Sequence, residues 1–245
     1  MTHASHQKLV LFDLDGTVVN TFGAGLRALS VAAQRIFGAE LDPATIVAAG
    51  RLDPEIMADL LERFGRTPAP EGIAAYHAGY REALPEALAH TGATVCPGVP
   101  ELMAALGRRP EVTLGVLTGN YADTGSIKMR ACGVDPARFP IHVWADDADP
   151  EAPARAQLPA VALDRFAAMT GAPIDPLRAI IIGDTPADIA CARANGCRVI
   201  AVATGPIAKD ELAAHEPDLL LDDLTDAGRV IDFTLADAAP ADSAP

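Results

Sequence analysis

The most regular feature of the sequence is a series of short apolar runs that recur along the chain. Each run is rich in Val, Ile and Leu, which is the pattern of buried β-strands. They cover residues 9–12, 112–117, 141–144, 179–182, 199–202 and 219–221. Segments with helical spacing separate most of them. Strands that alternate with helices indicate an α/β fold, in which helices cover both faces of a mostly parallel sheet and the ligand lies at the carboxyl ends of the strands.

The interval between the first two runs departs from this pattern. It contains no strand candidate, and three of its stretches carry apolar residues at helical spacing. These residues are Leu26, Leu29, Ala33 and Ile36, then Ile56, Leu60, Leu61 and Phe64, then Ile73, Tyr76, Tyr80 and Leu84. Since a crossover needs one helix, we interpret residues 20–92 as an inserted, all-helical subdomain, and residues 1–19 and 93–234 as the core domain.

Two segments mark the limits of these units. The sequence Cys96-Pro97-Gly98-Val99-Pro100 predicts a stiff turn that returns the chain to the core domain, followed by a helix over residues 101–106. Residues 235–245 are mainly Ala, Asp, Pro and Ser, with little to bury, and we expect them to be disordered.

Composition and charge narrow the possible partners. Hydrophobic residues make up 50% of the chain and aromatic residues only 4%, which suits helices packed around an aliphatic sheet. The net charge of −14 repels phosphate backbones and anionic lipid, so we expect neither nucleic acid nor a membrane as a partner. The four cysteines show no CxxC spacing, and the run at residues 9–12 is too short for a signal peptide. We therefore expect a cytoplasmic protein, whose oligomeric state the sequence leaves open.

The first apolar run leads into two carboxylates, Asp13 and Asp15, which precede a glycine turn in Leu-Phe-Asp-Leu-Asp-Gly-Thr. On an extended strand they point the same way, and their repulsion requires a cation, a proton or a specific role. A purely structural alternative, an Asx-type turn with one capping aspartate, accounts for one of them but not for both.

Two other runs end in polar residues. Asp184 and Asp188 follow the fourth run, and if its strand lies beside the first, the carboxylates converge and call for a hard divalent cation. The alternative is an ordinary N-cap region before the next helix. After the second run come Thr118, Gly119 and Asn120, whose hydroxyl and backbone amides can donate to phosphate oxygens, although they also fit a plain turn and helix cap.

Taken in this order, the motifs resemble the signature of the haloacid dehalogenase superfamily: DxDGT, a strand ending in Thr or Ser, a basic residue, and GDxxxD. The inserted helices resemble the branch that includes phosphoglycolate phosphatases and β-phosphoglucomutases. This resemblance implies a Rossmann-like core and a mobile helical cap, residues 20–92, that closes over the site.

The resemblance also implies roles for individual residues. Asp13 matches the nucleophile that forms an aspartyl phosphate, and Asp15 matches the general acid and base. Thr118 matches the residue that holds a phosphoryl oxygen. Mg²⁺ is expected on the carboxylate of Asp13, the backbone carbonyl of Asp15, and Asp184, with Asp188 helping directly or through water.

The basic residue is where the sequence departs from the family pattern, which has a lysine. We favour Arg155, because Lys128 lies ten residues after Thr118 on the next helix, which would carry it away from the phosphate. The alternatives are an exposed Arg155 and a Lys128 that serves through an irregular turn. In the cap, Arg51 falls in the expected specificity loop and could bind a second substrate group, or it could belong to a surface loop in which Asp53 caps the next helix.

Together these features predict a Mg²⁺-dependent phosphatase acting on a small phosphorylated metabolite. A phosphomutase of the β-phosphoglucomutase type is the alternative within the same fold. A non-catalytic phospho-receiver or binding protein is the alternative outside enzymology, but a receiver has no use for an inserted cap or for Asp15 as an acid.

Overall fold

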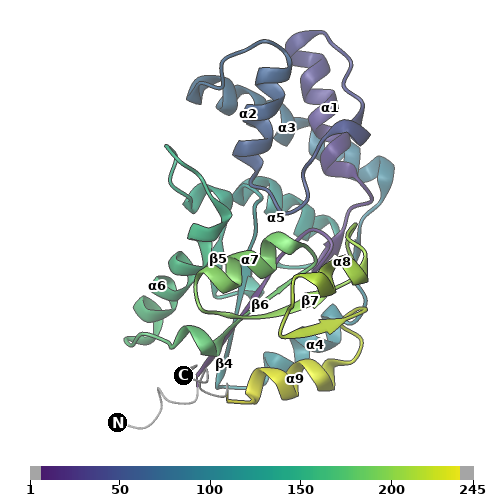
Figure 1. Ribbon diagram of the computed structural model, residues 1–245. Coiled ribbons are helices and arrows are strands. Elements are labelled where there is room, and N and C mark those ends of the chain that lie inside the picture. Colours follow the sequence, from purple (N-terminus) through teal and green to yellow (C-terminus); the bar gives the residue numbers. More distant parts are fainter. Residues whose placement is uncertain (1–6, 238–245) are drawn as a thin grey trace.

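The computed structural model describes residues 7–237 and contains a parallel sheet of six strands in the order β5-β4-β1-β6-β7-β8 (Figure 1). The strands are β1 (Lys8–Phe12), β4 (Val112–Leu117), β5 (Ile141–Val143), β6 (Ala179–Gly183), β7 (Arg198–Val202) and β8 (Leu219–Leu221). Each matches one apolar run of the sequence. The predicted α/β fold with a Rossmann-like parallel sheet is therefore confirmed, and β1 lies at its centre between β4 and β6.

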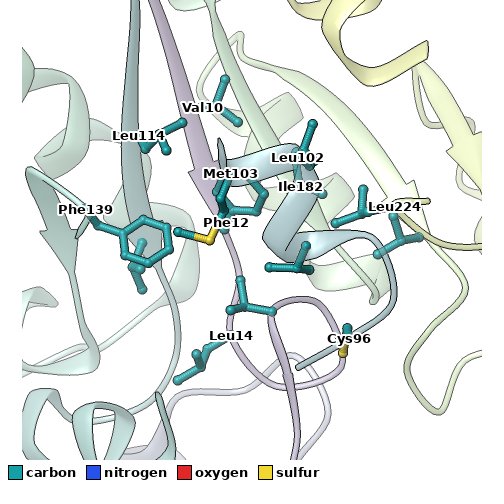
Figure 2. Close-up of a cluster of buried hydrophobic side chains, with 14 of the residues drawn as sticks. Val10, Phe12, Leu14, Cys96, Leu102, Met103, Leu114, Phe139, Ile182 and Leu224 are labelled. Carbon is teal, nitrogen blue, oxygen red and sulfur yellow. The ribbon is translucent and has the colours of Figure 1, made fainter. Parts of the chain in front are cut away.

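Alternate residues of the strands point to opposite faces of the sheet and form two separate cores. Val10 and Phe12 of β1 pack on one face with Leu102 of α4 (Figure 2). Leu9 and Leu11 pack on the other face, against residues of α6 and α7. Because both faces are covered, every residue of β1 is buried.

Nine α-helices lie within the described residues. They are α1 (Ala24–Phe37), α2 (Asp53–Arg63), α3 (Pro70–Thr91), α4 (Val99–Leu106), α5 (Ala122–Ala131), α6 (Leu158–Thr170), α7 (Pro186–Ala194), α8 (Lys209–Ala214) and α9 (Ala227–Leu235). Helices α4 and α9 contribute to the core on one face of the sheet, and α6, α7 and α8 contribute to the core on the other face.

Helices α1, α2 and α3 correspond to the three helical stretches expected in the inserted segment, and they form a group at one end of the molecule (Figure 1). They surround a hydrophobic cluster of their own. Within it, the buried hydroxyl of Tyr76 donates a hydrogen bond of 2.8 Å to the carbonyl of Leu29. We refer to residues 20–92 as the cap and to the other described residues as the core, and we keep the division of the chain into two such domains as a proposal.

The expectation that residues 13–111 hold no strand is wrong. Two short strands, β2 (Val19–Asn20) and β3 (Thr94–Val95), pair in antiparallel fashion where the chain leaves and re-enters the core. Strands of two residues carry no periodic pattern, since their pairing depends on where the chain returns.

Two further limits differ from those expected. Helix α4 begins at Val99 rather than at residue 101, because Pro100 fits the first turn of a helix and Gly98 turns the chain just before it. Leu235, the first residue of the tail expected to be disordered, is the last residue of α9, whereas residues 238–245 of that tail lie outside the described residues. Within residues 7–237, no helix combines the length and the apolar composition needed to cross a bilayer.

Candidate active site

The candidate site lies at the carboxyl edge of the three central strands. Asp13 follows β1, Thr118 follows β4, and Asp184 follows β6. The strand register brings these ends to the same level, and the backbone N–H of Asp13 donates to the carbonyl of Ile182 at 2.9 Å. The sequence-predicted residues from three distant segments therefore meet at one edge, as parallel topology requires.

Asp13, Asp184 and Asp188 form a buried acidic cluster in which one carboxylate oxygen from each lies within 4.8 Å of the others. Burial raises the pKa of Asp13 to about 6, against the opposing effect of Arg155. Burial, followed by the neighbouring Asp13 and Asp188, raises the pKa of Asp184 to about 9. The pKa of a carboxyl group rises in this way when several such groups lie close together, away from water and without enough positive charge nearby.

Arg155, the basic residue favoured by the sequence, lies in this cluster. Its Nη2 atom donates to the carboxylate of Asp13 at 2.8 Å and also to the carboxylate of Asp188. Its Nε atom is buried and has no hydrogen-bond partner among the described residues. The alternative of an exposed Arg155 is wrong, since the side chain is only 9% exposed.

The acidic cluster fits a divalent cation in both charge and chemistry. If all three carboxylates ionise, the single guanidinium leaves two negative charges uncompensated, and a divalent ion carries the matching charge. Carboxylate oxygens are also the ligands that Mg²⁺ and Ca²⁺ prefer. Asp13 and Asp184 are therefore the residues best suited to hold such an ion.

Space for the Asp184 carboxylate depends on two glycines. A Cβ atom on Gly16, whose φ is +81°, would lie 2.4 Å from Asp184 Oδ2, and one on Gly205 would lie 1.6 Å from the same oxygen. The hydroxyl of Thr17 donates to Asp184 Oδ1 at 3.2 Å. Any side chain larger than glycine at residue 16 or residue 205 would therefore displace the carboxylate.

Asp188 has a structural role in addition to its place in the cluster. Its Oδ2 atom accepts hydrogen bonds from the backbone N–H of Thr185 at 3.1 Å and from the hydroxyl of Thr185 at 2.7 Å. These bonds fix the start of α7, as the N-cap alternative proposed. With Arg155 on its Oδ1 atom, Asp188 has protein donors on both carboxylate oxygens.

Asp15 is held by a second group of polar side chains. Its Oδ2 atom accepts from Lys128 Nζ at 2.6 Å and from Asn120 Nδ2 at 2.8 Å. Asn120 Nδ2 also donates to the hydroxyl oxygen of Thr118 at 2.9 Å, and Asn120 Oδ1 accepts from Lys128 at 2.6 Å. The network joins the ends of β1 and β4 to α5.

The expectation that α5 carries Lys128 away from the site is therefore wrong. Helix α5 starts at Ala122, only a short segment after the end of β4, and a lysine side chain on a helix leans back toward the N-terminus. That direction brings the ammonium group to Asp15. Although burial alone would lower the pKa of Lys128, the adjacent Asp15 carboxylate raises it, so the side chain stays charged.

The cap contacts the core at the predicted substrate-binding residue Gly119. The carbonyl of Gly119 accepts from the backbone N–H of Asp53 at 2.7 Å, and a Cβ on Gly119 would lie 2.1 Å from the carbonyl oxygen of Arg51. The Asp53 carboxylate accepts from the backbone N–H of Tyr121 at 3.0 Å. The start of α2 is thereby joined directly to the segment that follows β4.

The structure changes the interpretation of two cap residues. Arg51 lines the cavity, but its guanidinium donates to Asp59 at 2.6 Å and to the carbonyl of Val47. Asp53 does not cap its own helix as the alternative expected, because its carboxylate is turned toward Tyr121 at the N-cap of α5. Burial raises the pKa of Asp53 to about 6, partly offset by Lys128.

A cavity of about 620 Å³ lies between these groups and the cap. The core contributes Asp13, Asp15, Gly16, Thr118, Gly119, Asn120, Lys128, Arg155, Asp184, Thr185, Thr204, Gly205 and Pro206. The cap and its connection contribute residues of α1, the segment over residues 46–51, the start of α2, and Tyr80 of α3. The site can therefore enclose a small molecule whose anionic group faces the acidic and basic side chains.

Several residues of the site were not predicted from the sequence. Gly205 follows β7, the strand next to β6, so the rule that ligands lie at strand ends offered a signal. Thr17 belongs to the first motif, and its contact with Asp184 needed the strand order. For Asp53 and Tyr80, whose contacts depend on how cap and core meet, the sequence carries no comparable signal.

Comparison with known proteins identifies the family to which this arrangement of fold and site residues belongs. The model of the haloacid dehalogenase-like hydrolase family matches residues 10–202. Among curated proteins, validoxylamine A 7'-phosphate phosphatase from Streptomyces hygroscopicus subsp. limoneus is 29% identical over 225 residues, which cover 89% of this chain and 95% of the relative.

Solved structures agree on the fold. A hydrolase from Pseudomonas syringae superposes with a TM-score of 0.72 at 22% identity, over 92% of this chain and 98% of the other. CbbY from Rhodobacter sphaeroides, solved in complex with phosphate, gives 0.72 at 22% identity, over 91% of this chain and 96% of the other. At these identities the similarity shows a shared fold.

Proposed function

Since the chain belongs to the family of haloacid dehalogenase-like hydrolases, we propose that it is a Mg²⁺-dependent phosphatase that hydrolyses a small phosphorylated metabolite through an aspartyl phosphate on Asp13. The observation that carries the proposal is the buried cluster of Asp13, Asp184 and Asp188, of which Asp13 and Asp184 line the same cavity as Asp15. The similarity to validoxylamine A 7'-phosphate phosphatase, which extends over 95% of that protein, supports the same reaction class.

In the first step, a carboxylate oxygen of Asp13 attacks phosphorus, and the bond between phosphorus and the alcohol oxygen breaks. The departing oxygen takes a proton from Asp15. In the second step, Asp15 removes a proton from water as the water oxygen attacks the acyl phosphate. Inorganic phosphate leaves and Asp13 returns to its carboxylate, so two easier displacements replace one difficult one.

The residues around the two acids support these roles. Lys128 and Asn120 fix the carboxylate of Asp15 from one side, which leaves its orientation defined without blocking the cavity. Arg155 holds Asp13 and also lines the cavity, so its guanidinium can donate to a phosphoryl oxygen. Thr118 uses its hydroxyl oxygen as an acceptor from Asn120, so the hydroxyl proton can be donated to another phosphoryl oxygen.

Asp13 and Asp184 would hold Mg²⁺, and the backbone carbonyl of Asp15 would complete the set of protein ligands. Asp188 would act through water, because protein donors occupy both its oxygens. When bound, the ion supplies positive charge beside the phosphoryl group, which the acidic chain as a whole does not offer.

The test is hydrolysis of p-nitrophenyl phosphate by the purified chain with Mg²⁺ or with EDTA. We expect metal-dependent turnover and a loss of at least about 10³-fold in Asp13→Asn. Asp222→Asn, which removes a surface carboxylate paired with Lys209, is the matched control and should retain activity. Borohydride reduction of a quenched reaction should convert the phosphorylated aspartate at residue 13 to homoserine, detectable by mass spectrometry.

Two results would contradict the proposal: turnover that survives complete chelation, or an Asp13→Asn protein that remains as active as the control. Transfer of the phosphoryl group to a second hydroxyl, with no inorganic phosphate released, would instead assign the chain as a phosphomutase.

A further inference from the structure

The end of the cavity away from the acidic cluster is lined mainly by aliphatic side chains. Leu26 and Leu29 of α1, Ile46 of the following connection, and Ile56 of α2 face it. Three of these, Leu29, Ile46 and Ile56, are at most 7% exposed. The wall that meets the alcohol part of a phosphate ester therefore has little capacity for hydrogen bonds.

Two large hydrophobic side chains stand exposed where the same cavity opens. Phe22 is 56% exposed and Val47 is 71% exposed, and both line the cavity. Phe22 has a φ of 48°, which non-glycine residues rarely adopt, and the side chain of Asn20 stabilises this bend by accepting from the Phe22 backbone N–H at 2.9 Å. This backbone bend keeps the aromatic ring of Phe22 exposed to solvent, and the ring extends the apolar wall of the cavity toward its entrance.

Two polar side chains near this wall already have partners within the protein. Asp53 accepts from Tyr121, and the hydroxyl of Tyr80 lies next to Lys128. Of the three cationic residues that line the cavity within the described chain, Arg51 is paired with Asp59 in the cap, and Lys128 is paired with Asp15. The third, Arg155, lies at the acidic cluster. No cation on the apolar side is left for a second anionic group.

We propose that the substrate is a phosphate monoester of an alcohol with an apolar body, carrying neither a second phosphate, nor a carboxylate, nor several hydroxyl groups. This inference rests on the proposed phosphatase function and adds the class of alcohol. The phosphoryl group lies at Asp13, and the apolar body contacts the side chains of Leu26, Leu29, Ile46 and Ile56. An apolar body gains by leaving water, whereas a polyol would lose hydrogen bonds that this wall does not replace.

The test compares phosphate esters of primary alcohols, so that the leaving group stays chemically similar while its body changes. In the series ethyl, propyl, butyl and hexyl phosphate, kcat/KM should rise by about 2- to 4-fold per methylene. Glycerol 1-phosphate, matched to propyl phosphate in carbon number, should be at least about 10-fold poorer. A terminal carboxylate added to butyl phosphate should lower kcat/KM by a similar factor or more.

Two cap variants locate the effect. Val47→Gln changes an exposed side chain and leaves the folded core untouched, and Leu26→Gln places an amide on the half-buried wall. Both should reduce the gain per methylene, with the larger effect from Leu26→Gln. Met169→Gln, an exposed apolar residue on α6 outside the cavity, is the matched control and should keep the gain of the unmodified chain.

The outcomes separate this inference from the function on which it rests. Hydrolysis with a flat alkyl series, or with glycerol or sugar phosphates preferred over alkyl phosphates, would overturn the apolar substrate class alone. If both Val47→Gln and Leu26→Gln kept the same gain in kcat/KM per methylene as the unmodified chain, the inference would also be overturned, because the wall would then not contact the substrate. Absence of turnover with every ester, including p-nitrophenyl phosphate, would overturn the phosphatase function together with this inference.

Discussion

Asp53 offers a quantitative test of how the cap meets the core. The residue is 9% exposed, and burial raises the pKa of its carboxyl group to about 6, from an ordinary value of 3.8. An acid whose pKa is raised in the folded state destabilises that state once it ionises. The penalty is absent below pH 3.8, grows as the pH rises toward 6, and is complete above that. One pKa unit corresponds to 1.36 kcal/mol, so the full penalty is about 3 kcal/mol.

We therefore expect Asp53→Asn to be more stable than the unmodified chain by an amount that grows with pH. The amide can still accept the hydrogen bond from Tyr121, but it carries no charge to bury. Urea denaturation in EDTA, followed by circular dichroism between pH 4 and pH 8, gives the difference in unfolding free energy. The other carboxyl groups titrate in both proteins and cancel from this difference.

The difference should increase by up to about 3 kcal/mol between pH 4 and pH 7. Glu62→Gln, which removes an exposed carboxylate from the same helix, is the control for a simple change in net charge. A difference that stays constant with pH, or that falls as the pH rises, would refute the argument, because the Asp53 carboxylate would then not be desolvated by the contact with the core.

Three other substitutions probe the site from different sides. Gly205→Ala places a methyl group 1.6 Å from Asp184 Oδ2, so Mg²⁺ affinity measured by calorimetry should fall at least about 10-fold, while Ala203→Gly nearby should not lower it. Lys128→Met leaves Asn120 as the remaining hydrogen-bond donor to Asp15. The value of kcat/KM for p-nitrophenyl phosphate should therefore fall by about 10²-fold. The melting temperature of the variant checks that it still folds. Arg155→Met removes the one cation of the acidic cluster and should lower the unfolding free energy without metal by about 3 kcal/mol, whereas Arg155→Lys should recover part of it.

The parallel sheet and the acidic cluster could be predicted because both follow from local patterns. Apolar runs of strand length define β1, β4 and β6, and the residue after each run lies at the carboxyl edge whatever the details of packing. This rule singled out Asp13, Thr118 and Asp184 as candidates, and the resemblance to the haloacid dehalogenase superfamily then supplied their expected roles. Their convergence required in addition only that the three strands be neighbours, which the strand order confirms.

Contacts that depend on the direction of a helix or on the meeting of two units could not be predicted in this way. The distance of Lys128 from the site was misjudged, since counting residues along a helix ignores where the helix starts and how its side chains lean. Asp53 has the sequence context of an ordinary helix start, Asp-Pro-Glu, and its contact with Tyr121 exists only because the cap lies against the core.

The segment after β4 serves the cap and the chemistry at the same time. The carbonyl of Gly119 and the backbone N–H of Tyr121 bind Asp53, while Asn120, between them, holds Asp15 and the hydroxyl of Thr118. A shift of Asp53 away from the core would free both ends of this short segment, and the orientation of Asn120 depends on those ends. The contact between cap and core is therefore also a constraint on Asp15, the proposed general acid and base.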